Sequence, residues 1–186
     1  MESITRKEAI DKVKQNVSDD KLRKHMYAVS DIMKELAKEL DKDVKNWSLS
    51  GLLHDIDYEE TQDDFKLHGK ISAEMVSEEV SGEILDAIRS HNYENTGFKP
   101  EKEMDYGLIA SDALSGLIVA TALVMPNSSL EEVRVESVMK KIDDSSFAKS
   151  IDRDRIKMCE ELGLELEKFV ELGLEAMKKD SERLGL

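Results

Sequence analysis

The side chains in this sequence that could carry chemistry are a small set of histidines and aspartates. The chain has four histidines and a single cysteine, Cys159. One cysteine gives no cysteine pair for a metal, so any bound metal must take imidazole and carboxylate ligands. The adjacent pair His54-Asp55 offers both types, and its carboxylate could bridge two cations about 3.5–4 Å apart. The other candidate ligands are His25, His68, His91 and Asp112.

Two of these candidates should point inward from helices. His25 follows Leu22 by three residues, which places both on one face of a helix. Asp112 follows Ile109 at the same spacing. A buried carboxylate is costly unless it is paired, neutralised or bound to a cation. Because a single inward histidine is most often an ordinary core residue, the prediction of a metal site depends on the whole ordered set.

The elements that must position these residues are helices. Apolar residues recur at spacings of three and four almost throughout, which predicts an all-α protein, a helical bundle without strands. Thr5 and Glu8 form a capping-box pattern, Asp43 is placed to cap a helix, and Pro126 ends a long apolar segment. The expected helices span about 5–16, 19–41, 43–54, 66–80, 81–91, 102–125, 130–142, 153–162 and 165–183, with loops at about 56–65 and 93–101.

Composition limits the class of protein. With 40% hydrophobic and 37% charged residues, the chain has the balance of a globular protein, and 186 residues suffice for one domain. We expect a single domain over 1–186, with a metal-site core at about 20–125 and a helical extension at about 128–186. The net charge of −14 argues against nucleic acid as a partner. No segment approaches 18 uncharged apolar residues, so we expect no membrane partner and a cytoplasmic location.

The ordered set resembles a known family. The order H…HD…H…H…D is similar to that of the HD superfamily of metal-dependent phosphohydrolases. The strings KHMYAVSDIM, GLLHDIDYE, LHGKISAEMV, AIRSHN and ASDALSGLIVATALV resemble a compact bacterial and archaeal branch of predicted HD hydrolases, over nearly the whole chain. The resemblance implies the helical HD-domain fold. It also implies one divalent cation held by His25, His54, Asp55 and Asp112.

The dinuclear branches of that superfamily add two histidines between the HD pair and the last aspartate. His68 and His91 occupy those places. The resemblance therefore implies a second cation, with Asp55 as the bridging and catalytic carboxylate. The metal itself stays open among Mn, Fe, Co, Ni, Mg and Zn, because imidazole and carboxylate ligands suit all of them.

The resemblance is less informative about the substrate. One dinuclear branch hydrolyses diadenosine tetraphosphate, and its HG-x-x-(G/A)-A and (A/I)-R-x-H motifs are similar to segments 68–73 and 88–91. That branch has a lysine two residues past the HD pair, where Asp57 and Tyr58 stand here. The GYP motif of the cyclic-dinucleotide phosphodiesterases and the ED pair of the guanosine-tetraphosphate hydrolases are both absent.

The implied reaction is hydrolysis of a small-molecule phosphate, a phosphomonoester or phosphoanhydride and most simply that of a nucleotide. A divalent cation lowers the pKa of a bound water, and the resulting hydroxide attacks phosphorus. Candidates to protonate the leaving group are Asp57, Glu59 and Glu60. Candidates to contact the substrate are Arg89, Lys99 and Asn92.

Two other functions remain open at this point. Di-iron HD proteins that cleave carbon bonds with oxygen use a similar six-ligand site, so an oxygenase is one alternative. A non-catalytic regulatory or binding module that retains a metal site is the other. The apolar segment 108–125 could be core or the seam of a homodimer, and the sequence does not separate these two cases.

Overall fold

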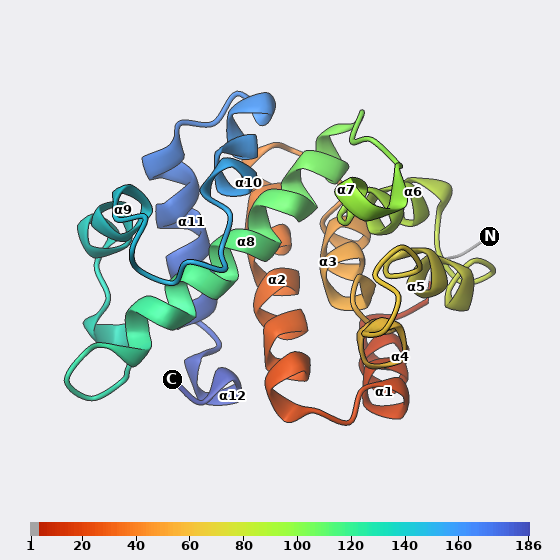
Figure 1. Cartoon of the computed structure of the whole chain (residues 1–186), viewed down its shortest axis with the longest axis horizontal. Helices are drawn as coiled ribbons and strands as arrows, with labels where there is room; N and C mark the ends of the chain where they lie inside the picture. Colours follow the sequence, from red (N-terminus) through yellow and green to blue (C-terminus); the bar gives the residue numbers. More distant parts are fainter. Residues whose placement is uncertain (1–3) are drawn as a thin grey trace.

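The computed structural model describes residues 4–186, and over that range it contains helices and no strand (Figure 1). The prediction of an all-α fold is therefore confirmed. In chain order the elements are α1 (Arg6–Asn16), α2 (Asp20–Glu39), α3 (Val44–Leu53), α4 (Tyr58–Thr61), α5 (Lys70–Met75), α6 (Gly82–Ser90), α7 (Tyr93–Thr96), α8 (Glu103–Leu123), the 3-10 helix η1 (Leu130–Glu132), α9 (Val135–Asp143), α10 (Arg153–Lys157), the 3-10 helix η2 (Met158–Leu162), α11 (Leu166–Lys178) and α12 (Ser181–Leu184).

Two long helices, α2 and α8, form the centre of the bundle, and α8 crosses α2 in Figure 1. Helix α2 also packs against α3 and α11, and α8 packs against α6, α9 and α10. The buried face of α2 is apolar at helical spacing, with Met26, Val29, Met33 and Leu36 fully buried. One continuous apolar cluster extends from α1 to α12, so the segment after residue 128 shares the core of the helices that carry the candidate ligands.

Local signals set the ends of the first helices. The Thr5 side chain accepts from the backbone N–H of Glu8, and the Glu8 carboxylate accepts from that of Thr5, which completes the predicted capping box. The Asp43 carboxylate accepts from the backbone N–H of Asn46 and begins α3. These caps satisfy N–H groups that have no partner inside the helix, and they confirm the predicted starts of α1 and α3.

Helices α2 and α3 approach closely because Gly51 has no side chain. A Cβ atom at this position would lie 2.9 Å from the backbone of Ser30 on α2. The Ser30 hydroxyl donates to the carbonyl of Ser48 at 2.8 Å, which ties the two helices together at the same place. This contact holds the C-terminal end of α3, where His54 lies, against the helix that carries His25.

Helix α8 corrects one expectation from the sequence. By length and apolar composition it could cross a membrane, whereas no segment near that limit was expected from the sequence. Most of the helix is buried among its neighbours, including Leu108, Leu114 and Ile118. A helix that is apolar nearly all round is typical of a protein core as well as of a membrane span, and here the surrounding helices cover it.

The predicted helix over 66–80 is wrong in its extent, because the helix is only α5, from Lys70 to Met75. Gly69 has a φ of +85°, a left-handed conformation that glycine adopts readily, and α5 begins only after it. The predicted loop 56–65 contains the short α4, and the helix expected at 153–162 divides into α10 and η2.

Candidate metal centre

Packing brings the six candidate ligands together from five parts of the chain. His25 lies on α2, His54 and Asp55 at the C-terminal end of α3, and His91 at the C-terminal end of α6. His68 precedes α5, and Asp112 lies in the middle of α8. Five of the six line one cavity of about 550 Å³, and His54 is fully buried beside them.

The Asp55 carboxylate lies at the centre of the cluster. Its Oδ1 is 3.2 Å from Nε2 of His54. The same oxygen is 3.3 Å from Nε2 of His68 and 3.3 Å from Nε2 of His91. Its Oδ2 is 3.7 Å from Nε2 of His25. Four imidazoles from four segments therefore present the same ring nitrogen to one carboxylate.

These atoms form two groups that could each hold a cation. His25, His54 and Asp55 form one group and Asp55, His68 and His91 the other, with the ligand atoms of each within 4.8 Å of one another. Oδ1 of Asp112 lies 3.2 Å from Nε2 of His25 and adds a second carboxylate to the first group. Asp55 belongs to both groups, which is the geometry of a carboxylate that bridges two cations.

Backbone carbonyls orient two of the rings. Nδ1 of His54 donates to the carbonyl of Gly51 at 2.8 Å, and Nδ1 of His91 donates to that of Ile88 at 2.5 Å. A histidine whose Nδ1 carries the proton has Nε2 free as a ligand atom. Both rings thus have their Nε2 lone pair directed at the cluster, as metal-binding histidines do.

Asp57 orients a third ring, a role that the sequence did not reveal. Its fully buried carboxylate accepts from Nδ1 of His68 at 2.8 Å and from the backbone N–H groups of Gly69 and Ser72, each at 2.8 Å. One side chain therefore caps α5 and fixes His68. The only available signal was its place two residues after the HD pair. Of the other acidic candidates, Glu59 accepts from the backbone N–H groups of Ser18 and Asp19, just before α2 begins.

The surroundings of Nε2 of His54 indicate whether the cluster fits a metal. This nitrogen is buried and has no hydrogen-bond partner within residues 4–186. An unsatisfied buried polar atom costs about 1–3 kcal/mol, and a coordinated cation would remove that cost. With Asp55 and Asp112 to supply negative charge nearby, the residues present fit a divalent cation.

The cluster shifts the proton affinities of its members. Burial disfavours the charged form of Asp55, but His54, His68 and His91 outweigh it and hold the pKa of this carboxyl well below its usual value. Burial also opposes protonation of His68, but Asp55 and Asp57 raise its pKa to about 10. Burial lowers the pKa of His91. Cation binding at His68 would therefore compete with a proton.

The predicted substrate contacts divide between two places. Asn92 lines the metal cavity, but its amide nitrogen donates to the carbonyls of Phe65 and His68 at 2.8 and 3.2 Å, so it holds the loop that carries His68. Arg89 pairs with Asp86 and lies over the Phe98 ring. Neither Arg89 nor Lys99 lines the metal cavity.

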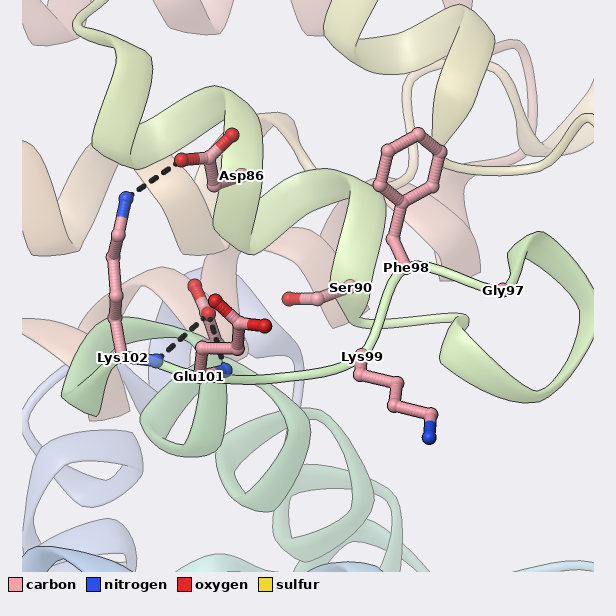
Figure 2. Close-up of a pocket in the computed structure, with 8 residues that line it drawn as sticks. Asp86, Ser90, Gly97, Phe98, Lys99, Glu101 and Lys102 are labelled. Atoms are coloured by element: carbon pink, nitrogen blue, oxygen red, sulfur yellow. Dashed lines mark hydrogen bonds and ion pairs between the residues drawn. The ribbon is translucent and has the colours of Figure 1, made fainter.

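Lys99 lies instead in a separate pocket of about 440 Å³ between α6 and the start of α8. Figure 2 shows the ion pair between Lys102 and Asp86 in this pocket, with Lys99 on the same connecting segment. This pocket and the metal cavity share no lining residue.

The cavity wall also contains residues that no sequence pattern indicated. The Tyr58 and Phe65 rings meet edge to face at 5.8 Å, and both contact the His68 ring. Arg155 of α10 donates from Nη2 to Oδ2 of Asp112 at 3.2 Å and to the carbonyl of His91 at 2.6 Å. No short spacing links Arg155 to the ligands, so a sequence pattern could not identify it.

Comparison with known proteins places the chain in a family. No curated protein and no solved structure matches it. The HD domain matches residues 22–122, more than half of the 186 residues, and this range includes all six residues of the cluster. The chain belongs to the HD domain family.

Proposed function

We propose that the protein is a metal-dependent phosphohydrolase that cleaves a phosphomonoester or phosphoanhydride of a small molecule, such as a nucleotide. The observation that carries the proposal is the shared position of Asp55 between two groups of ligand atoms. Two cations held close together by one carboxylate are typical of enzymes that displace groups at phosphorus. Membership of the HD family agrees with a metal-dependent hydrolase.

Divalent cations at these residues would lower the pKa of a bound water toward neutrality and stabilise negative charge on phosphoryl oxygens. Asp55, with its lowered pKa, stays ionised and holds the centre of the cluster. Asp57, Gly51 and Ile88 fix the imidazole rings through their Nδ1 atoms. Ring orientation is therefore set before any ligand arrives, which preserves the reacting geometry.

The cavity supports a substrate with a planar group. Phe65 is 42% exposed although it contacts the buried ring of His68, so part of its ring is open to a ligand. Tyr58 extends this aromatic wall. Aromatic rings stack favourably with planar groups, and a nucleobase is such a group. The volume of about 550 Å³ is that of a small-molecule site. We propose no nucleic-acid partner, given the net charge of −14.

The test begins with the bound metal. Protein purified without chelator is analysed for its elements and is then assayed with Mn²⁺, Fe²⁺, Co²⁺ and Mg²⁺ against phosphomonoesters, nucleotides and dinucleoside polyphosphates. We expect metal-dependent phosphate release by the wild-type protein and none by His54→Ala or Asp55→Ala. Circular dichroism of both variants checks that loss of activity is not loss of the fold.

Two outcomes would overturn the proposal. Tightly bound iron with oxygen consumption and no phosphate release would instead establish a di-iron oxygenase on the same ligands. Absence of both metal and turnover under every condition would leave a regulatory or binding module.

A further inference from the structure

Arg155 places a fixed positive charge in the wall of the metal cavity. Its side chain is 18% exposed, and it comes from α10, outside the matched range 22–122. Both of its hydrogen bonds use Nη2, to Asp112 and to the carbonyl of His91. Nε is buried without a partner among residues 4–186. No hydrogen bond joins Nη1 to a described residue either, and the Arg155 side chain lines the metal cavity.

The segment that carries Arg155 is firmly held. Asp152 caps α10 by accepting from the backbone N–H of Asp154. Ile156, the next residue after Arg155, is fully buried against the core. The neighbouring Arg153 guanidinium donates to five backbone carbonyls, those of Lys141, Asp144, Phe147, Ala148 and Ile151. Arg155 is therefore pre-positioned and needs no large movement to meet a ligand.

A guanidinium beside a cation site requires an explanation, because like charges repel strongly where water is excluded. The carboxylates of Asp55, Asp57 and Asp112 balance only part of the charge that two divalent cations and Arg155 would bring. The occupied site would carry net positive charge. An anion with more than one negative charge would neutralise this excess charge. Arginine binds phosphate oxygens through directed, charge-assisted hydrogen bonds.

We propose that Arg155 is a specificity-determining residue that binds a terminal phosphate group and so favours phosphomonoesters and terminal phosphoanhydrides over phosphodiesters. This inference rests on the proposed function and narrows its substrate class. A terminal phosphate has three non-bridging oxygens, enough for two cations and Arg155. A diester phosphate, or an internal phosphate of a dinucleoside polyphosphate, has only two. The third oxygen therefore distinguishes the two classes of substrate.

The experiment compares Arg155→Gln and Arg155→Lys with the wild-type protein. Lys157→Gln is the matched control, because Lys157 lies on the same helix and its exposed side chain pairs, among residues 4–186, only with Asp154. Calorimetry first measures Mn²⁺ binding alone. It then measures binding of inorganic phosphate and of dimethyl phosphate to the Mn²⁺-loaded proteins. Steady-state assays compare p-nitrophenyl phosphate with bis(p-nitrophenyl) phosphate.

For Arg155→Gln we expect phosphate affinity to fall on the order of ten- to a hundredfold, the loss of a charged hydrogen bond, with dimethyl phosphate affinity nearly unchanged. The ratio of kcat/KM for monoester to that for diester should fall by a similar factor. For Arg155→Lys both quantities should lie between those of the wild-type protein and Arg155→Gln. Lysine keeps the positive charge but lacks the planar set of N–H donors of a guanidinium. Because Arg155 also contacts Asp112, Mn²⁺ affinity is measured in each variant and the phosphate titrations are made at saturating Mn²⁺. Lys157→Gln should keep the Mn²⁺ and phosphate affinities of the wild-type protein.

Two results would overturn the inference. One is an unchanged phosphate affinity and an unchanged monoester-to-diester ratio in Arg155→Gln. The other is an equal loss for both phosphates together with weaker Mn²⁺ binding, which would show that Arg155 only supports Asp112. The proposed function is judged separately: a wild-type protein that shows Arg155-dependent phosphate binding but no turnover would contradict the enzyme and leave the inference standing.

Discussion

The Asp57 carboxylate accepts a hydrogen bond from Nδ1 of His68 at 2.8 Å, and it also caps α5 through the N–H groups of Gly69 and Ser72. The orientation of one candidate metal ligand and the start of the helix that follows it therefore depend on a single buried side chain. The same aspartate is where the sequence departs from the branch that hydrolyses diadenosine tetraphosphate. The departure thus falls on a residue that orients a candidate ligand, His68, through its Nδ1 atom.

Replacement of Asp57 should affect one metal position more than the other. In Asp57→Asn an amide –NH₂ replaces one carboxylate oxygen and would face the N–H donors that this oxygen accepts from. We expect binding of the second Mn²⁺ to weaken about 10- to 100-fold, as for other partners of metal-bound histidines. The free energy of unfolding should fall by about 1–3 kcal/mol. Calorimetric titration with Mn²⁺ and urea unfolding measure these effects. Two sites of wild-type affinity would contradict this account.

The number of metals per chain should separate the two ligand groups. His68 belongs only to the second group, whereas Asp55 belongs to both. Elemental analysis after equilibration with Mn²⁺ should therefore find about two ions in the wild-type protein and about one in His68→Ala. Asp55→Ala should lose both. Retention of two ions by His68→Ala would show that the second cation does not depend on this imidazole.

Gly51 should be intolerant of even a methyl group. A Cβ there would lie 2.9 Å from the Ser30 backbone, so α3 must move away from α2 in Gly51→Ala. We expect a loss of about 1–3 kcal/mol, the usual cost of overpacking, measured by urea unfolding. Gly82→Ala is the control, because nothing lies within 4 Å of its Cβ position. A Gly51→Ala protein as stable as this control would disprove the close contact.

The buried thiol of Cys159 should make stability fall at alkaline pH. Burial raises its pKa to about 12 in the folded protein, whereas an unfolded cysteine has a pKa of about 8.5. Between these values only the unfolded chain releases the proton, so rising pH favours unfolding. Urea unfolding at pH 7 and pH 10 should show a smaller decrease for Cys159→Ala than for the wild-type protein. Rapid labelling of the native thiol by a disulfide reagent at pH 8 would contradict its burial.

Local patterns in the sequence are sufficient to predict the helical class and several helix ends. Spacings of three and four and capping residues such as Thr5 and Asp43 act within a few positions of the chain, and the structure confirms them. The ordered histidines and aspartates also pointed to the HD family, which the match over 22–122 confirms. That these six residues bind metal remains a prediction, now with a geometry to test.

How those residues meet depends on long-range packing. The convergence on Asp55 requires packing of α2, α3, α5 and α6, and no local pattern encodes a contact between distant segments. Lys99 has the chemistry of a phosphate contact, yet it lines another pocket, and Arg155 enters the cavity from the C-terminal region. Charge type is visible in a sequence, but the direction of a side chain is fixed by the packing of its whole helix, which depends on contacts far along the chain.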